Sequence, residues 1–147
     1  MLRTAALTLV ATILSSTAHA QGKSSTNVAC AAPKMRVACA IYDVSLVQLI
    51  ATPDRFHNKT VRVVGYAHIQ GINTGLYLSR EAFDQGVTKN AAWLEVAADS
   101  IDAAATQFGD RYVRVTAVWN AHELGNLHLW SGSLERVRKV EVWGKRF

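Results

Sequence analysis

An amphipathic helix over residues 99–108 is the feature that most constrains the fold of this chain of 147 residues. Asp99 or Ser100 is expected to cap its first turn, and Gly109 follows the last one. The helix separates two groups of predicted strands, and that order of elements decides the fold class. Its apolar side chains recur at i, i+3, i+4 and i+7: Ile101, Ala104, Ala105 and Phe108.

Five segments have the alternation and the β-branched content of strands. The first is centred on Gly65, where a glycine often marks a bulge or a sharp bend. The last is expected to begin at residues 127–130, to break at Ser131-Gly132-Ser133 and to resume over residues 134–143. In chain order, the predicted strands are residues 60–69, 76–78, 91–96, 111–121 and 127–143.

A short helix precedes the first strand. Ser45 and Gln48 fit a capping box, and a turn led by Pro53 follows. Five strands with a helix between the third and the fourth is the layout of an OB-fold barrel. We therefore predict an all-β protein with minor helices: a five-stranded OB-fold barrel, with a short N-terminal helix before strand 1 and a helix between strands 3 and 4.

Residues 1–20 have the three parts of a secretory signal peptide. Arg3 supplies the positive charge, residues 5–14 are apolar, and Ala18-His19-Ala20 has the small-x-small pattern that signal peptidase cleaves after. The apolar run is too short to span a membrane, and no second long one follows. We expect cleavage after Ala20, a periplasmic or secreted protein, and no transmembrane span.

Both cysteines, Cys30 and Cys39, follow the predicted cleavage site. An even number of cysteines in an oxidising compartment favours a disulfide, and two cysteines alone cannot build a tetrahedral zinc site. We predict one structural disulfide in an N-terminal extension over residues 21–42. The OB-fold domain is expected over residues 43–147.

The net charge is +5, from 16 Lys and Arg against 11 Asp and Glu. In a cytosolic protein this balance would favour nucleic acid as a partner. Outside the cytoplasm it is equally compatible with anionic headgroups, acidic glycans or no specific partner. The predicted signal peptide therefore disfavours nucleic acid.

Residues 44–66, VSLVQLIATPDRFHNKTVRVVGY, resemble the opening of small exported bacterial OB-fold proteins related to the tRNA-anticodon-binding-like superfamily, which are mostly uncharacterised. In those proteins a short helix and a Pro-led turn precede a strand of the form K-x-V-x-V-x-G-Y. The resemblance covers about residues 43–143 and implies the OB fold; the superfamily name implies nucleic-acid binding. Other similar segments are LYLSRE at residues 76–81, TKN at residues 88–90 and SGSL at residues 131–134.

The chain lacks a complete catalytic or metal signature. His122-Glu123 begins like the HExxH zinc motif, but Asn126 stands where the second histidine is needed. There is no GxSxG elbow, P-loop or GxGxxG sequence. We expect no catalytic residues, no metal site and no cofactor.

The usual ligand face of an OB fold consists of strands 2 and 3 with the loops joining strands 1–2 and 4–5. Here the two loops are residues 70–75 and 122–126. Aromatic rings beside arginines stack well on bases or sugar rings, while packing within the core is the alternative role of each ring. The candidate ligand-binding residues are Tyr77, Trp93, Arg62, Tyr66 and Arg80.

These observations predict an exported, non-enzymatic OB-fold binding module. Its ligand would be a glycan, a peptide, a lipid headgroup or a protein partner in the periplasm. The first alternative is a single-stranded nucleic-acid-binding protein, and the second is a hydrolase of unknown type. A salt titration of ligand binding distinguishes the binding module from the first alternative, because contacts to phosphates make the affinity for nucleic acid fall steeply as salt increases.

Overall fold

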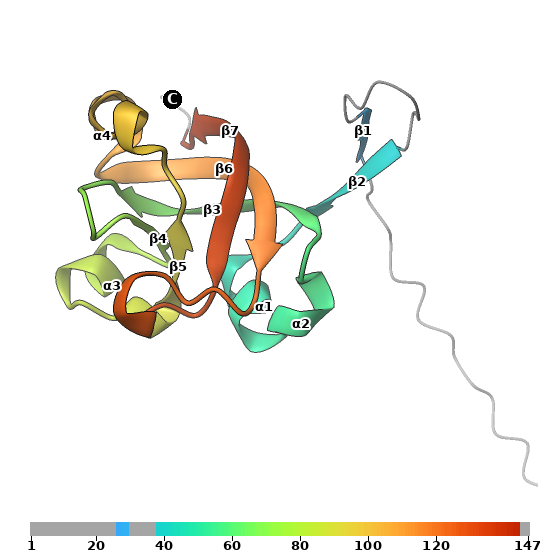
Figure 1. The fold of residues 1–147 in the computed structure, drawn as a ribbon, viewed down its shortest axis with the longest axis horizontal. Coiled ribbons are helices and arrows are strands. Elements are labelled where there is room, and N and C mark those ends of the chain that lie inside the picture. The colour runs from blue at the N-terminus through green and yellow to red at the C-terminus, as the bar shows by residue number, and fades with distance from the viewer. Residues whose placement is uncertain (1–25, 30–37, 145–147) are drawn as a thin grey trace, which may run out of the picture.

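Five strands close into a barrel at the centre of the computed structural model, which describes residues 26–29 and 38–144 (Figure 1). They pair in the order β3-β4-β5-β7-β6, and β6 pairs back with β3. β5 and β7 are parallel, and the other four pairs are antiparallel. The predicted OB-fold barrel is confirmed. The barrel strands are β3 (Thr60–His68), β4 (Gly75–Tyr77), β5 (Ala91–Leu94), β6 (Arg111–Asn120) and β7 (Ser133–Val142).

Two further strands extend the sheet outside the barrel. β2 (Ala38–Asp43) pairs in parallel with β3, and β1 (Thr26–Ala29) pairs antiparallel with β2. The sequence assigned no structure to this Ala-rich region. The predicted signal peptide and Cys30 lie outside the described residues, and so does the side chain of Cys39, so the disulfide stays a prediction.

The barrel is filled by the inward side chains that period-two alternation predicts. Leu94 and Leu134, from the parallel pair, are 1 % and 0 % exposed. At Gly65, β3 and β4 approach closely: a Cβ added there would lie 2.6 Å from the backbone oxygen of Tyr77. The other inward residues include Val61, Val63, Ala67, Val113, Val115, Ala117 and Trp119.

Short helices close the two ends of the barrel (Figure 1). The predicted capping box starts the first of them, because the Ser45 Oγ accepts from the Gln48 amide at 3.1 Å and the Ser45 amide donates to the Gln48 side chain at 2.9 Å. The amphipathic stripe of the helix between β5 and β6 packs on the core as expected. Among the described residues, no helix has the length and apolarity that crossing a membrane requires. The helices are α1 (Leu46–Ala51), α2 (Pro53–Phe56), α3 (Arg80–Asp84) and α4 (Ile101–Phe108), with 3-10 turns at Thr88–Asn90, Ala98–Ser100 and Asn126–His128.

Two local predictions were wrong. Residues 127–130 do not begin the last strand, because Leu127 and His128 adopt left-handed φ values of 54° and 55°, which a strand excludes. They belong to the loop between β6 and β7. Gly109 does not take the left-handed position after α4, since its φ is −67°; Asp110 takes it instead, with φ 52°.

Candidate ligand-binding site

An open cleft of about 610 Å³ lies on the outer face of β5 and β7. The loop between β3 and β4 contributes Gly71 and Ile72 to its wall, and the loop between β6 and β7 contributes Glu123, Gly125 and Asn126. These are the two loops that the OB layout pointed to in the sequence. The volume is in the range of small-molecule sites, about 300–1,000 Å³.

The parallel pairing of β5 with β7 builds the floor of the cleft. Trp93 lies opposite Ser133, and the next pair, Leu94 and Leu134, points into the barrel core. The flanking side chains therefore point outward, because successive side chains on a strand alternate between faces. The Glu95 amide donates to the Leu134 carbonyl at 3.0 Å, which continues the register and places Glu95 opposite Glu135.

Each of the three glutamates at the cleft is held by an uncharged donor. Glu95 accepts from the Arg136 backbone amide at 3.0 Å, and Glu123 accepts from the amide of Gly125 at 3.1 Å. Glu135 accepts from the side-chain amide of Asn120 at 2.7 Å. Within residues 38–144, no lysine, arginine or histidine forms an ion pair with any of the three. The cleft is therefore negatively charged on a chain whose net charge is +5.

Ser133 adds a polar group without a partner. Its residue is 1 % exposed, and its Oγ is the one buried side-chain nitrogen or oxygen in the described part of the chain that makes no hydrogen bond. Ser133 lines the cleft, on the same face as Trp93. Leaving a buried hydroxyl unpaired costs about 1–3 kcal/mol, so a ligand group that bonds to it gains that amount.

The loop between β6 and β7 packs directly on Trp93. Gly125 has φ 63°, and a Cβ added there would lie 2.8 Å from the Trp93 Cγ and 2.6 Å from the Trp130 Cδ1. Only glycine allows both this backbone conformation and this approach. The indole of Trp93 is half-buried as a result and is fixed at the wall of the cleft.

Tyr66 and Tyr77 belong to a second aromatic core outside the barrel and do not line the cleft. They are 5 % and 1 % exposed and pack with Trp130 and with Phe83 of α3. Ring centroids lie 5.3 Å apart between Tyr77 and Trp130, and 5.6 Å apart between Trp130 and Trp93. Burial raises the pKa of both tyrosine hydroxyls. Trp93 is thus the end of this cluster that reaches the cleft.

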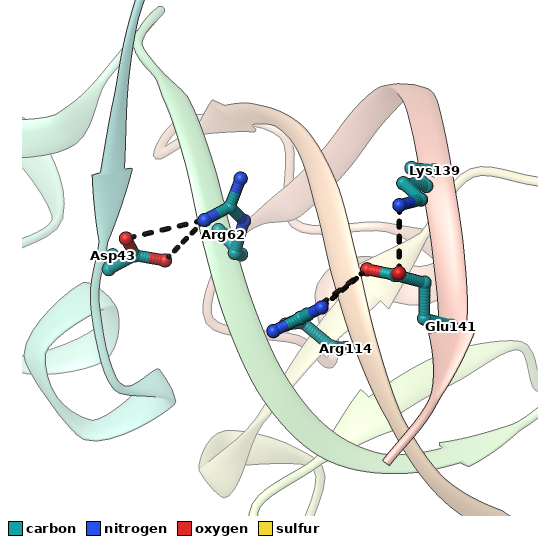
Figure 2. A network of polar contacts seen from close by, with 5 residues as sticks. All are labelled: Asp43, Arg62, Arg114, Lys139 and Glu141. Carbon is teal, nitrogen blue, oxygen red and sulfur yellow. Dashed lines mark hydrogen bonds and ion pairs between the residues drawn. The ribbon is translucent and has the colours of Figure 1, made fainter. Parts of the chain in front are cut away.

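The two candidate arginines lie elsewhere. Arg80 is exposed on α3 and forms an ion pair with Asp84 at 3.6 Å. Arg62 lies on the outer face of β3, where it pairs with Asp43 at 3.3 Å (Figure 2). The structure therefore places neither arginine beside Trp93.

A second ion-pair group lies next to Arg62 on this face (Figure 2). Glu141 bonds to Arg114 at 2.8 Å and to Lys139 at 2.7 Å. The hydrogen bonds from Lys139 and Arg114 lower the pKa of Glu141. Arg62, Arg114 and Lys139 on this face therefore each have a carboxylate partner.

Sequence reasoning missed the acidic residues of the cleft and Ser133. The alternation of β5 does place Glu95 on the same face as Trp93, which was a usable signal. Glu123, Ser133 and Glu135 come from segments about 30–40 residues further along the chain, and their position depends on the pairing of β5 with β7. Within the described residues, no three His, Cys, Asp or Glu side chains converge closely enough to hold a metal ion.

Comparisons with known proteins identify no relative by sequence: no family model matches the chain, and no curated protein matches it. One similar solved structure is a chain from Leishmania major Friedlin described as an aspartyl-tRNA synthetase. The TM-score is 0.42 at 14 % identity, over 68 % of this chain and 20 % of that one. What this protein binds therefore has to be inferred from the residues of its own cleft.

Proposed function

We propose that this protein is an exported, non-enzymatic OB-fold binding module whose ligand lies in the cleft between the β3–β4 and β6–β7 loops. One observation carries the proposal: Trp93 stands at an open cleft beside three carboxylates without ion-pair partners in the described chain. An aromatic ring supplies contact area, and the carboxylates accept hydrogen bonds. Together they suit a ligand that donates hydrogen bonds and carries no negative charge.

The charge of the cleft favours this ligand class over a nucleic acid. A phosphate about 4 Å from one carboxylate is repelled by about 1 kcal/mol in bulk water and about 4 kcal/mol at the effective dielectric of a protein surface. Single-stranded nucleic-acid sites use the opposite arrangement, a basic groove with stacking rings. Arg62 and Arg114, the arginines of the outer β3–β6 face, are already paired with Asp43 and Glu141.

The test is a binding panel with matched tryptophan variants. The full chain, and Trp93→Ala and Trp143→Ala variants of it, are titrated by calorimetry with short neutral oligosaccharides, lysine- and arginine-containing hexapeptides, and a dT oligonucleotide. Trp143 is the control, because it is 48 % exposed and lies over Arg114 on another face. We expect a non-anionic probe to bind, Trp93→Ala to weaken it at least tenfold, and Trp143→Ala to leave it unchanged.

Other outcomes would contradict the proposal. Binding of the oligonucleotide alone, with an affinity that falls steeply with salt, would favour the nucleic-acid alternative. Cleavage of a bound probe would contradict the non-enzymatic assignment. Mass spectrometry of the protein from its native host tests export. We expect an N-terminus at Gln21, and an intact leader would contradict export.

A further inference from the structure

We infer that the cleft binds an organic cation, a primary ammonium or guanidinium group of the kind carried by lysine and arginine side chains, between Glu95 and Glu135. The inference rests on the proposed function and deepens it by naming the ligand chemistry. Two independent features of the cleft carry it: the facing carboxylates of Glu95, which directly follows β5, and Glu135 of β7, and the unpaired hydroxyl of Ser133.

The first feature is a like-charge pair on neighbouring strands. Glu95 and Glu135 continue the register that sets Trp93 opposite Ser133. Neighbouring strands of a sheet lie about 4.8 Å apart, so facing side chains on one face are close, and like charges there repel each other. A cation between the two carboxylates turns that repulsion into attraction.

Two other facing pairs of the sheet carry opposite charges. On β6 and β7, Arg114 lies opposite Glu141 and bonds to it. On β2 and β3, Asp43 lies opposite Arg62 and bonds to it. At these two places the sheet sets opposite charges on facing positions, whereas Glu95 and Glu135 have the same charge.

The second feature is the Ser133 hydroxyl, which is buried, lines the cleft and has no partner in the described chain. A hydroxyl oxygen accepts hydrogen bonds from N–H donors, and an ammonium or a guanidinium offers several. Ser133 is two residues before Glu135 on one face of β7, so the two residues line the same cleft.

The size and lining of the cleft favour an organic cation over a metal ion. The cleft has a volume of about 610 Å³, and no three of its described carboxylates lie close enough together to hold a metal ion. Trp93 lines the same cleft, and the face of an indole attracts ammonium and guanidinium groups. A neutral sugar would leave the carboxylate repulsion in place.

The experiment titrates the full chain with probes that differ in charge and in whether the cation belongs to a peptide. The probes are a lysine-containing hexapeptide, the same peptide with acetylated lysines, an arginine-containing hexapeptide and free cadaverine. The cleft variant is Glu95→Gln with Glu135→Gln. The control is Glu81→Gln with Asp102→Asn, which removes the same charge from exposed positions on α3 and α4.

We expect the cationic peptides to bind, acetylation to weaken binding at least tenfold, and the cleft variant to weaken it at least tenfold. The control should stay within twofold of the parent chain. Equal affinity for cadaverine would assign the site to free amines, and weaker cadaverine binding would assign it to peptide side chains; both support the inference.

Two outcomes overturn the inference and differ in what they leave standing. Binding of the acetylated peptide or a neutral oligosaccharide that depends on Trp93 but not on the glutamates would refute the cation and keep the cleft as the binding site. If the control variant lost as much affinity as the cleft variant, the loss would come from the change in net charge and not from a site between the two glutamates. No Trp93-dependent binding of any probe would refute the proposed function as well.

Discussion

Removing the opposed charges of the cleft should stabilise the free protein. The change is Glu95→Gln with Glu135→Gln. The backbone amide of Arg136 now donates to Glu95, and the side-chain amide of Asn120 donates to Glu135. A glutamine keeps an oxygen that can accept each of these hydrogen bonds, so the substitutions remove charge and little else. Most substitutions destabilise a folded protein, so a gain in stability is a specific result.

The size of the gain follows from the geometry. At about 5 Å, the spacing of neighbouring strands, two unit charges repel by about 0.8 kcal/mol at the dielectric constant of bulk water and by about 3 kcal/mol at an effective value of 20. Glu95 is exposed and Glu135 is half-buried, so solvent screens the pair and the lower figure applies. We expect the free energy of unfolding to rise by about 0.8 kcal/mol, or the melting temperature by about 2–4 °C for a domain of slightly more than 100 residues.

The assay is urea unfolding of the two proteins in low salt and again in 1 M NaCl. The difference between them should shrink in high salt, because ions screen exposed charges. The control pair Glu81→Gln and Asp102→Asn removes the same net charge from the first turns of α3 and α4, where a carboxylate is favourable, so the control should not gain stability. A cleft variant that is no more stable than the parent chain, or a gain equal to that of the control, would refute the opposed-carboxylate reasoning.

Two further predictions concern the fold around the cleft. Gly65→Ala should lower the free energy of unfolding by about 1–3 kcal/mol, because its Cβ would lie 2.6 Å from the backbone oxygen of Tyr77; an unchanged urea midpoint would contradict the close approach of β4. Burial raises the pKa of Tyr77 above its ordinary value of 10.0, so the unfolded chain loses this proton first as pH rises. Stability from Tyr77 is therefore complete below pH 10 and is lost as pH rises through the folded-state pKa, and Tyr77→Phe should flatten the alkaline side of a stability-against-pH curve. An unchanged alkaline slope would show that this hydroxyl does not titrate differently on folding.

The strands and faces of the barrel could be predicted because they depend on local pattern. Alternation assigned Val61 and Val63 to the core and Trp93 to the outer face, and the capping residues Ser45 and Gln48 located α1. Alternation also misassigned residues 127–130, where two left-handed residues turn the chain although apolar and polar side chains alternate.

The cleft could not be predicted because it depends on long-range pairing. Tyr77 is a candidate ligand contact in the sequence, yet period two cannot show that Phe83 and Trp130 pack against its ring. Glu95 and Glu135 are opposed only through the register of β5 with β7, which joins segments about 40 residues apart. A one-residue slip of that register would turn every side chain of β7 to the other face.

The location of the ligand is tested most directly by nuclear magnetic resonance of the isotope-labelled protein titrated with the lysine-containing hexapeptide. The account predicts that the largest shifts occur at the indole N–H of Trp93 and at the amides of Glu95, Ser133 and Glu135. Shifts confined to the outer β3–β6 face around Arg62 and Arg114, or equal shifts with a dT oligonucleotide, would contradict it.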